Sequence, residues 1–362
     1  MRTSTIFKEE IMKKLTIILS AILCLCLLAG CGQAAAPAAT EAPADGTGTA
    51  EPTVEEKSFE LKIAGIKSDE DPASLAMQFF ADEVNNNSDT LKVKVYTNSV
   101  LGTTNDLLSG MTDGTVDMFY NTLSCYAWVS GAECFNAISA PFMWDDNAEL
   151  EAFLETAEVQ AWFESAANDS GVRCVMAAGE LPPRELTSNR PVACAADFSG
   201  LKIRTAESAL VQETMKKLGA QPTVVPFADL YMALRQGTVD AQENGFMTVK
   251  SASLYEVQDY LMKTDYIRDV SAIFMGNDLW KQLSDNQKAV ITAAAEKAVR
   301  FEEATIAEQI DEVVAFLKDK MTYVEIDVNS IQEALGEDFY DQFDGDLWPA
   351  GTMDVIKAFK NA

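Results

Sequence analysis

The sequence contains no histidine among its 362 residues. Histidine titrates near neutral pH without help, and it is the commonest general base and metal ligand. Its absence excludes Ser/His/Asp triads, Cys/His dyads and most zinc sites. We therefore expect no enzyme, no metal and no cofactor, although paired carboxylates or a lysine base would still permit catalysis.

Basic residues are scarce. The chain has 28 Lys and Arg residues against 56 Asp and Glu residues, for a net charge of -28. Such a charge repels nucleic acid and anionic lipid headgroups, so we expect neither as a partner of the folded part. An anion that binds must be held by local cations.

The N-terminal apolar run, Leu15–Leu28, is too short to span a bilayer comfortably but suits an export signal. It follows Lys13 and Lys14 and leads into Leu28-Ala29-Gly30-Cys31, which resembles a bacterial lipobox. We predict that residues 1–30 are a lipoprotein signal peptide and that Cys31 carries lipid. A plain secretory signal is the alternative.

Residues 31–57 are rich in Ala, Pro, Thr, Gly and Glu and have no apolar periodicity, which predicts a disordered tether. Lipid and tether together would hold the folded part outside the cytoplasm, at the outer face of the cytoplasmic membrane. Met12 is an alternative start to Met1, because Met12-Lys13-Lys14 is a typical beginning of a signal.

Four cysteines remain after the lipid site: Cys125, Cys134, Cys174 and Cys194. They permit three full pairings, among which the sequence does not choose. A domain of this size does not need a disulfide framework, so we favour buried free thiols.

Strand and helix patterns alternate after the tether, which predicts an α/β fold with a largely parallel sheet. The expected strands are 59–64, 91–96, 116–118 and 172–176, and the expected helices are 72–84, 104–112 and 147–168. The pattern restarts with a strand at 201–204 and a helix at 206–218. A second unit of this kind predicts a second lobe.

A capping box at Ser284–Gln287 begins a helical pattern that runs to about Lys320. Such a helix would be about 50 Å long, so we expect it to span both lobes. Two helices with a kink are the alternative. We assign 58–181 with 270–309 to lobe I, and 182–269 with 310–362 to lobe II.

Arginines at strand ends and an amide-rich segment mark the stretch from Arg184 to Phe246. A guanidinium matches the two oxygens of a carboxylate, and ligands of such sheets bind at the carboxyl ends of the strands. The residues therefore favour a pocket for a small carboxylate.

Three segments of this stretch resemble the extracytoplasmic solute receptors of tripartite ATP-independent periplasmic (TRAP) transporters: Arg184–Pro191, Asp197–Arg204 and Leu218–Asn244. The similarity extends more weakly over residues 59–359. The resemblance implies a two-lobed, periplasmic-binding-protein-like fold. It also implies a monomeric receptor that passes an organic acid to a TRAP permease driven by an ion gradient.

The resemblance implies that Arg204 forms a two-pronged salt bridge with the ligand carboxylate, and that Arg184 and Asn244 also contact the ligand. Phe227 and Phe246 would be apolar walls. The residues alone leave alternatives open: Arg184 in an ion pair between the lobes, and the two phenylalanines in the core.

Ser68 and Asn121 lie at expected strand ends of lobe I and are its candidate ligand contacts. Two departures from the family pattern are Asp229, where glutamate is usual, and Gly245-Phe246, where dicarboxylate receptors commonly have proline. An aromatic residue at this position resembles the pattern of receptors for sugar acids more than that of dicarboxylate receptors. We therefore favour a uronate or related sugar acid over a dicarboxylate.

Two other functions fit the same residues. The chain could serve an ATP-driven importer or a sensor kinase as its solute receptor. It could also be an extracellular hydrolase that uses two carboxylates, for which Asp240 and Glu243 are the candidates.

Overall fold

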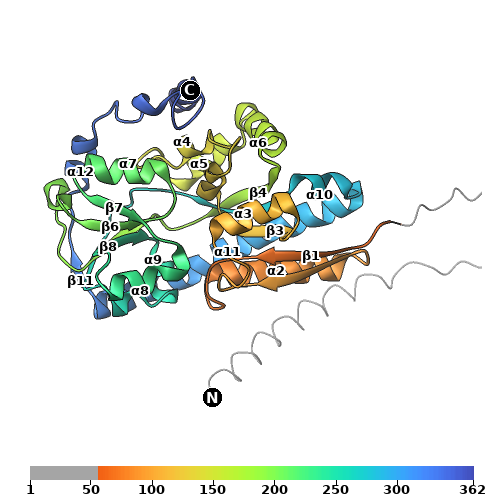
Figure 1. Ribbon diagram of the computed structural model, residues 1–362, viewed down its shortest axis with the longest axis horizontal. Helices are drawn as coiled ribbons and strands as arrows, with labels where there is room; N and C mark the ends of the chain where they lie inside the picture. Colours follow the sequence, from red (N-terminus) through yellow and green to blue (C-terminus); the bar gives the residue numbers. More distant parts are fainter. Residues whose placement is uncertain (1–55) are drawn as a thin grey trace, which may run out of the picture. The chain divides into compact units, whose positions relative to one another are not determined.

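The computed structural model describes residues 56–362, so the predicted signal peptide, the lipid site at Cys31 and nearly all of the tether lie outside the described residues. The described part contains two β-sheets with helices around them (Figure 1). This confirms the α/β fold class predicted from the alternating pattern.

The first sheet has the strand order β2-β1-β3-β10-β4. Its strands are β1 (Phe59–Ala64), β2 (Leu91–Tyr96), β3 (Met118–Thr122), β4 (Val172–Glu180) and β10 (Val270–Gly276). β1 is parallel to β2 and β3, whereas β10 runs antiparallel to β3 and β4. The strand expected at 116–118 begins two residues later, because the amide of Val116 still bonds to the carbonyl of Gly110 in the helix Thr104–Asp113.

The second sheet has the order β11-β9-β5-β8-β6-β7. Its strands are β5 (Glu185–Ser188), β6 (Lys202–Thr205), β7 (Gln221–Val224), β8 (Ala241–Asn244), β9 (Tyr260–Met262) and β11 (Thr322–Val324). β6 is parallel to β7 and β8, and β5 is antiparallel to β8. Residues 185–262 therefore supply five of the six strands of this sheet.

The helices flank both sheets. They are α2 (Pro72–Asn87), α3 (Thr104–Asp113), α4 (Phe135–Ile138), α5 (Asn147–Leu154), α6 (Ala157–Ser170), α7 (Ala209–Lys217), α8 (Leu230–Arg235), α9 (Phe246–Ser251), α10 (Asn277–Gln282), α11 (Asp285–Lys320), α12 (Val328–Leu335) and α13 (Thr352–Lys360). Short 3-10 helices are η1 (Leu123–Trp128), η2 (Ala195–Phe198), η3 (Phe227–Asp229), η4 (Leu254–Glu256) and η5 (Asp341–Phe343).

The single helix expected at 147–168 is wrong, because the chain forms α5 and α6 there. The side chain of Thr156 accepts a hydrogen bond from the amide of Val159 and starts α6. A threonine hydroxyl that bonds to nearby amides favours a helix start over a helix interior. The helix expected at 206–218 likewise begins at Ala209, where Ser208 caps it.

The long helix is confirmed as one unbroken element of 36 residues, α11. Ser284 and Gln287 form the predicted capping box at its start. Its first half packs on α2 and β4, and its second half packs on α9, η4 and β11 of the other sheet (Figure 1). The helix therefore spans both lobes, and the kinked alternative is wrong.

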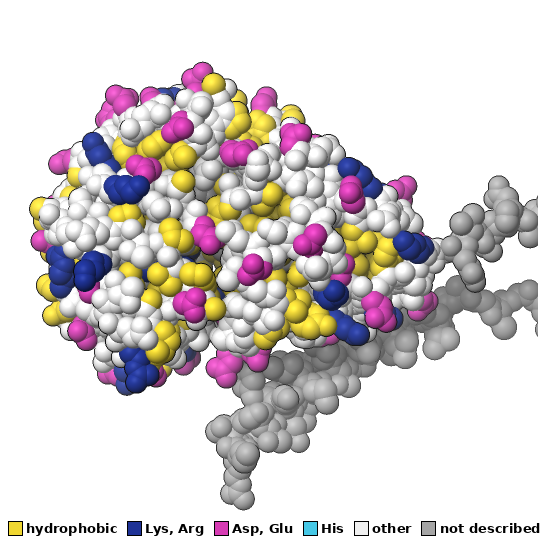
Figure 2. Space-filling model, in the orientation of Figure 1, with side chains coloured by type: hydrophobic (Ala, Val, Ile, Leu, Met, Phe, Trp, Pro, Cys, Tyr) yellow, Lys and Arg dark blue, Asp and Glu magenta, His cyan; other side chains and the backbone are white. Residues whose placement is uncertain are grey.

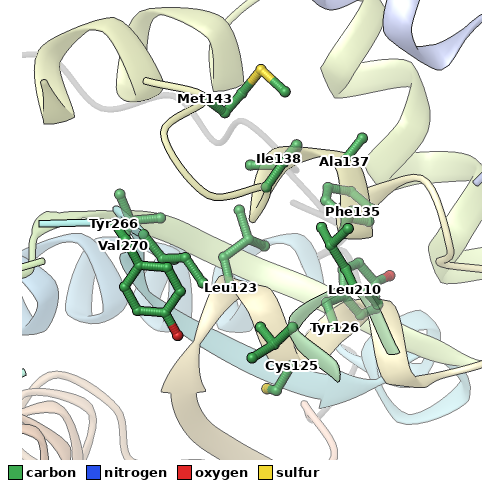
Figure 3. Packing of buried hydrophobic residues seen from close by; sticks show 14 of the residues in the cluster. Leu123, Cys125, Tyr126, Phe135, Ala137, Ile138, Met143, Leu210, Tyr266 and Val270 are labelled. Atoms are coloured by element: carbon green, nitrogen blue, oxygen red, sulfur yellow. The ribbon is translucent and has the colours of Figure 1, made fainter. Parts of the chain in front are cut away.

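One hydrophobic core joins segments that are far apart in the sequence (Figure 3). Tyr126 of η1 lies against Phe135 of α4, with ring centroids 4.8 Å apart, and Leu210 of α7 belongs to the same cluster. The Tyr126 hydroxyl donates to the carbonyl of Val172, so its polar end is satisfied at the core. This packing fixes η1, which lies beside the cavity described below.

The visible surface is rich in acidic groups, and the cysteines of the described part are free. Acidic side chains are scattered over the visible face (Figure 2). None of the four cysteines within residues 56–362 forms a disulfide, and Cys125 is fully buried while the others are partly exposed. No helix within residues 56–362 combines the length and apolar character that a membrane crossing needs.

Candidate ligand-binding site

The register of the second sheet brings three predicted residues to one edge. Asn244 ends β8 and pairs with Glu185, the first residue of the antiparallel β5, so Arg184 lies beside the end of β8. Arg204 lies in the parallel β6 and pairs with Gln242. Carboxyl ends of parallel strands meet at the same edge, which is where ligands of such sheets bind.

The first sheet presents its own edge in the same way. Asn121 lies near the end of β3, opposite Ala272 of the antiparallel β10, so Asp269 just before β10 lies at that edge too. Lys67 follows β1, which is parallel to β3. The two edges face a common cavity.

This cavity has a volume of about 90 Å³ and is lined from both sheets. A second cavity of about 80 Å³ adjoins it. By this measure each holds several water molecules. Residues that line both are Lys67, Asn121, Thr122, Arg184 and Asn244.

Arg184 is held by a buried ion pair with Glu243. Its Nε donates to Glu243 Oε2, and its Nη2 donates to the Glu243 carbonyl at 2.8 Å and to Oε1 at 2.9 Å. Burial alone would lower the pKa of Arg184, but the charge and hydrogen bonds of Glu243 raise it above its usual value. Both partners belong to the second sheet, so the alternative of an ion pair between the lobes is wrong.

A chain of buried amides fixes Asn244 beside this pair. Arg184 Nη2 donates to Asn244 Oδ1 at 3.3 Å, and Asn244 Nδ2 donates to Gln242 Oε1 at 2.6 Å. Gln242 Nε2 in turn donates to Thr187 Oγ1 at 2.8 Å. The amide-rich sequence of β8 therefore serves as the rigid support of the site.

Arg204 differs from Arg184 in having no acidic partner. Arg204 is only 3% exposed, and its Nε donates to the carbonyl of Val225 at 2.8 Å. Within residues 56–362 its side chain forms no salt bridge and no other hydrogen bond. Burial, together with the nearby charge of Arg184, lowers the pKa of Arg204 to about 10, although the charges of Glu243 and Glu207 oppose this shift. A buried cation without a direct ion pair favours an anion that enters the cavity.

Lys67 is a cavity residue that the sequence reasoning missed. Its Nζ donates to Thr248 Oγ1 at 2.9 Å, which joins the loop after β1 to α9 of the other sheet. The same Nζ lies 4.2 Å from the ring centroid of Phe227. Burial lowers the pKa of Lys67 to about 8. Its position three residues after the end of β1 was the available signal.

The other predicted residues divide into two groups. Asn121 and Phe227 line the first cavity, where Phe227 forms a wall. Ser68 and Phe246 line neither cavity. Ser68 faces α9, with its hydroxyl 3.4 Å from the carbonyl of Ser251, and Phe246 is 5% exposed in the core beneath α8 and α9.

The carboxylates of the hydrolase alternative are not brought together. Glu243 is engaged by Arg184, and Asp240, at the opposite end of β8, lines neither cavity. Within residues 56–362, no three Cys, Asp or Glu side chains cluster as metal ligands would.

These features define a solute-binding protein with a cavity between two lobes and an unpaired buried cation in it. The chain belongs to the bacterial extracellular solute-binding protein family 7 (DctP), whose model matches residues 63–345. This is the family of TRAP transporter solute receptors that the sequence resembles, so that prediction is confirmed. Its members act outside the cytoplasm with TRAP membrane subunits.

Relatives cover most of the folded part. The 2,3-diketo-L-gulonate-binding periplasmic protein YiaO of Escherichia coli is 30% identical over 271 residues, which are 74% of this chain and 81% of YiaO. The sialic acid-binding periplasmic protein SiaP of Vibrio cholerae is 30% identical over 261 residues, 71% of this chain and 79% of SiaP. The crystal structure of a TRAP solute-binding protein from Roseobacter denitrificans with bound L-galactonate has a TM-score of 0.76 at 26% identity, and the match covers 84% of this chain and 99% of that one.

Proposed function

We propose that this protein binds a sugar acid, an aldonate or uronate, and delivers it to a TRAP permease. The observation that carries the proposal is Arg204, a buried guanidinium that forms no ion pair among residues 56–362 and lines the cavity between the two sheets. A ligand carboxylate satisfies this group with two parallel hydrogen bonds.

Relatives support the choice of ligand class. YiaO is named for 2,3-diketo-L-gulonate, SiaP for sialic acid, and the Roseobacter denitrificans protein holds L-galactonate. All three ligands are hydroxylated acids with one carboxylate. This agrees with the preference for a sugar acid over a dicarboxylate.

We assign roles to the residues that meet at the cavity. Arg204 holds the carboxylate, and Arg184 and Asn244 donate to it from the rigid amide support. Asn121 contacts the ligand from the first sheet, and Phe227 covers an apolar face of it. Phe246 supports α9 from the core, and Ser68 contributes to contact between the lobes.

The two lobes close on the ligand around α11. We keep lobe I as 58–181 with 270–309 and lobe II as 182–269 with 310–362. Closure removes water from the carboxylate and strengthens the Arg204 bridge. We further propose that the protein is a monomer without enzymatic activity, anchored to the outer face of the cytoplasmic membrane by lipid on Cys31.

A thermal-shift and calorimetric titration with L-galactonate, L-gulonate and D-galacturonate tests this function. Ligand at 100 times its dissociation constant should stabilise the protein by about 2.7 kcal/mol. Arg204→Ala should abolish the shift. Arg235→Ala is the matched control, because Arg235 is exposed at the end of α8 and should leave binding unchanged. Retention of full affinity in Arg204→Ala would refute the proposal.

A further inference from the structure

The lining of the second cavity has more acidic than basic side chains, whereas the lining of the first has more basic than acidic ones. Three carboxylates line it: Asp71, Asp269 and Glu302. They are 4%, 7% and 4% exposed, respectively. Buried carboxylates are rare without partners, so the hydrogen bonds of each one indicate what this cavity accepts.

Asp269 keeps one oxygen without a partner. Its Oδ1 accepts hydrogen bonds from the amide of Ser124 at 3.3 Å and from its neighbour Val270 at 2.9 Å. Its Oδ2 is buried and accepts none from the described residues. An unsatisfied buried acceptor is costly, so a donor is expected from a molecule that occupies the cavity.

Glu302, from the long helix α11, has a similar arrangement. The hydroxyls of Tyr120 and Ser271 both donate to its Oε2, at 2.7 Å and 2.6 Å. Its Oε1 accepts no hydrogen bond from residues 56–362. The side chain is thus held in place by one oxygen, and the other remains for a ligand.

The two cavities adjoin each other, because five residues line both. A ligand whose carboxylate lies at Arg204 would have its remote end on the side of the second cavity. A second carboxylate there would meet three acidic groups and be repelled. An ammonium group would meet Lys67, which lines the same cavity. Neutral hydroxyl donors fit both conditions.

We propose that Asp269 and Glu302 are specificity-determining residues, which accept hydrogen bonds from the hydroxyl groups at the end of the ligand remote from its carboxylate. They thereby distinguish polyhydroxy monocarboxylates from dicarboxylates and from unsubstituted fatty acids of the same length. This inference rests on the proposed function, because it requires the carboxylate to be held by Arg204.

Isosteric variants test it, since Asp269→Asn and Glu302→Gln keep the oxygen that bonds to the protein and replace the free acceptor by a donor. Calorimetry at pH 8.5, above the pKa of Glu302, would compare three six-carbon acids: L-galactonate, hexanoate and adipate. Galactonate should bind the unmodified protein most tightly. Each variant should weaken the binding of galactonate by about tenfold or more, because a hydrogen bond from the ligand to a charged group is lost. Hexanoate affinity should change less than about twofold.

Glu303→Gln is the matched control on α11, because Glu303 faces solvent and pairs with Arg300. It should leave all three affinities unchanged. Melting curves verify folding, and if one variant fails to fold the other decides. The inference would be overturned if the Asp269→Asn and Glu302→Gln variants lost equal affinity for galactonate and hexanoate, or lost no affinity for galactonate. It would also be overturned if adipate bound as tightly as galactonate, or if 6-aminohexanoate bound more tightly.

The same measurements separate this inference from the proposed function. If Arg204→Ala abolishes galactonate binding while Asp269→Asn and Glu302→Gln leave its affinity intact, only the inference fails. If Arg204→Ala retains affinity, or no sugar acid binds, the function itself is refuted and the inference fails with it.

Discussion

Arg184 and Glu243 form a buried ion pair in which the guanidinium reaches the side chain and the backbone carbonyl of the same glutamate. The pair is complete within the protein. Arg204, on a neighbouring strand, has no such partner among residues 56–362. The site therefore contains one neutralised arginine that shapes the cavity and one free arginine that attracts an anion.

Glu243→Gln should destabilise the fold by about 3–5 kcal/mol, because it leaves the charge of Arg184 buried and unpaired. Urea denaturation measures the change. Glu213→Gln is the control: Glu213 pairs with Lys216 on the surface of α7, and its loss should cost no more than about 0.5 kcal/mol. Equal costs for the two variants would show that the buried pair has no special role.

Ser251 of α9 links the lobes by donating a hydrogen bond to Asp71 Oδ2 at 2.6 Å. Asp71 is buried at the start of α2, so Ser251→Ala leaves a carboxylate oxygen unsatisfied in the closed arrangement. Ligand affinity should fall by about tenfold, mainly through faster dissociation, although Ser251 lines neither cavity. Stopped-flow measurements of ligand release test this.

Ser165→Ala is the control for the hydrogen bond between Ser251 and Asp71, because Ser165 donates a similar bond to Asp169 at 3.0 Å on the exposed surface of α6. Its release rate should match that of the unmodified protein. If Ser251→Ala also released ligand at the unmodified rate, the bond to Asp71 would not contribute to closure.

Gly179 lets β4 pack directly on the long helix. Its φ is +88°, and a Cβ there would lie 2.8 Å from the carbonyl oxygen of Val299. Gly200 also has a positive φ, +69°, but open space around it. Gly200→Ala should therefore cost about 1 kcal/mol from backbone strain alone, and Gly179→Ala about 2 kcal/mol more from the clash. Similar unfolding midpoints for the two variants would contradict the close packing.

Patterns along the chain predicted the long helix and five of the eleven strands within residues 56–362, because those features depend on local periodicity and capping. The capping box at Ser284 and the alternation at Phe59–Ala64 are examples. The break at Thr156 was missed, since a threonine is compatible with both a helix interior and a helix start. The cap that its hydroxyl forms with the amide of Val159 is seen only in the structure.

The arginines and Asn244 were predictable because they lie in a specific motif at strand ends. The acceptors of the second cavity were not. Asp269 precedes β10, which pairs with β3 of the first sheet although the two strands are far apart in the sequence. Glu302 lies in the middle of α11 among other charged residues. Which glutamate of a helix faces inward is decided by packing against another sheet.

Glu302 should make stability depend on pH. Burial raises the pKa of Glu302 to about 7, in contact with Tyr120 and Ser271 and with Asp71 and Lys67 nearby. The folded protein then holds a proton that the unfolded chain releases between about pH 4.5 and 7. This group's contribution to the free energy of unfolding is thus complete at low pH and falls by about 3 kcal/mol as the pH rises through that window. Glu302→Gln cannot release a proton, so urea denaturation at pH 4.5 and pH 7.5 should show a smaller decrease for the variant. The partly exposed Glu303→Gln should follow the unmodified protein, and parallel curves for all three proteins would mean that Glu302 is charged throughout.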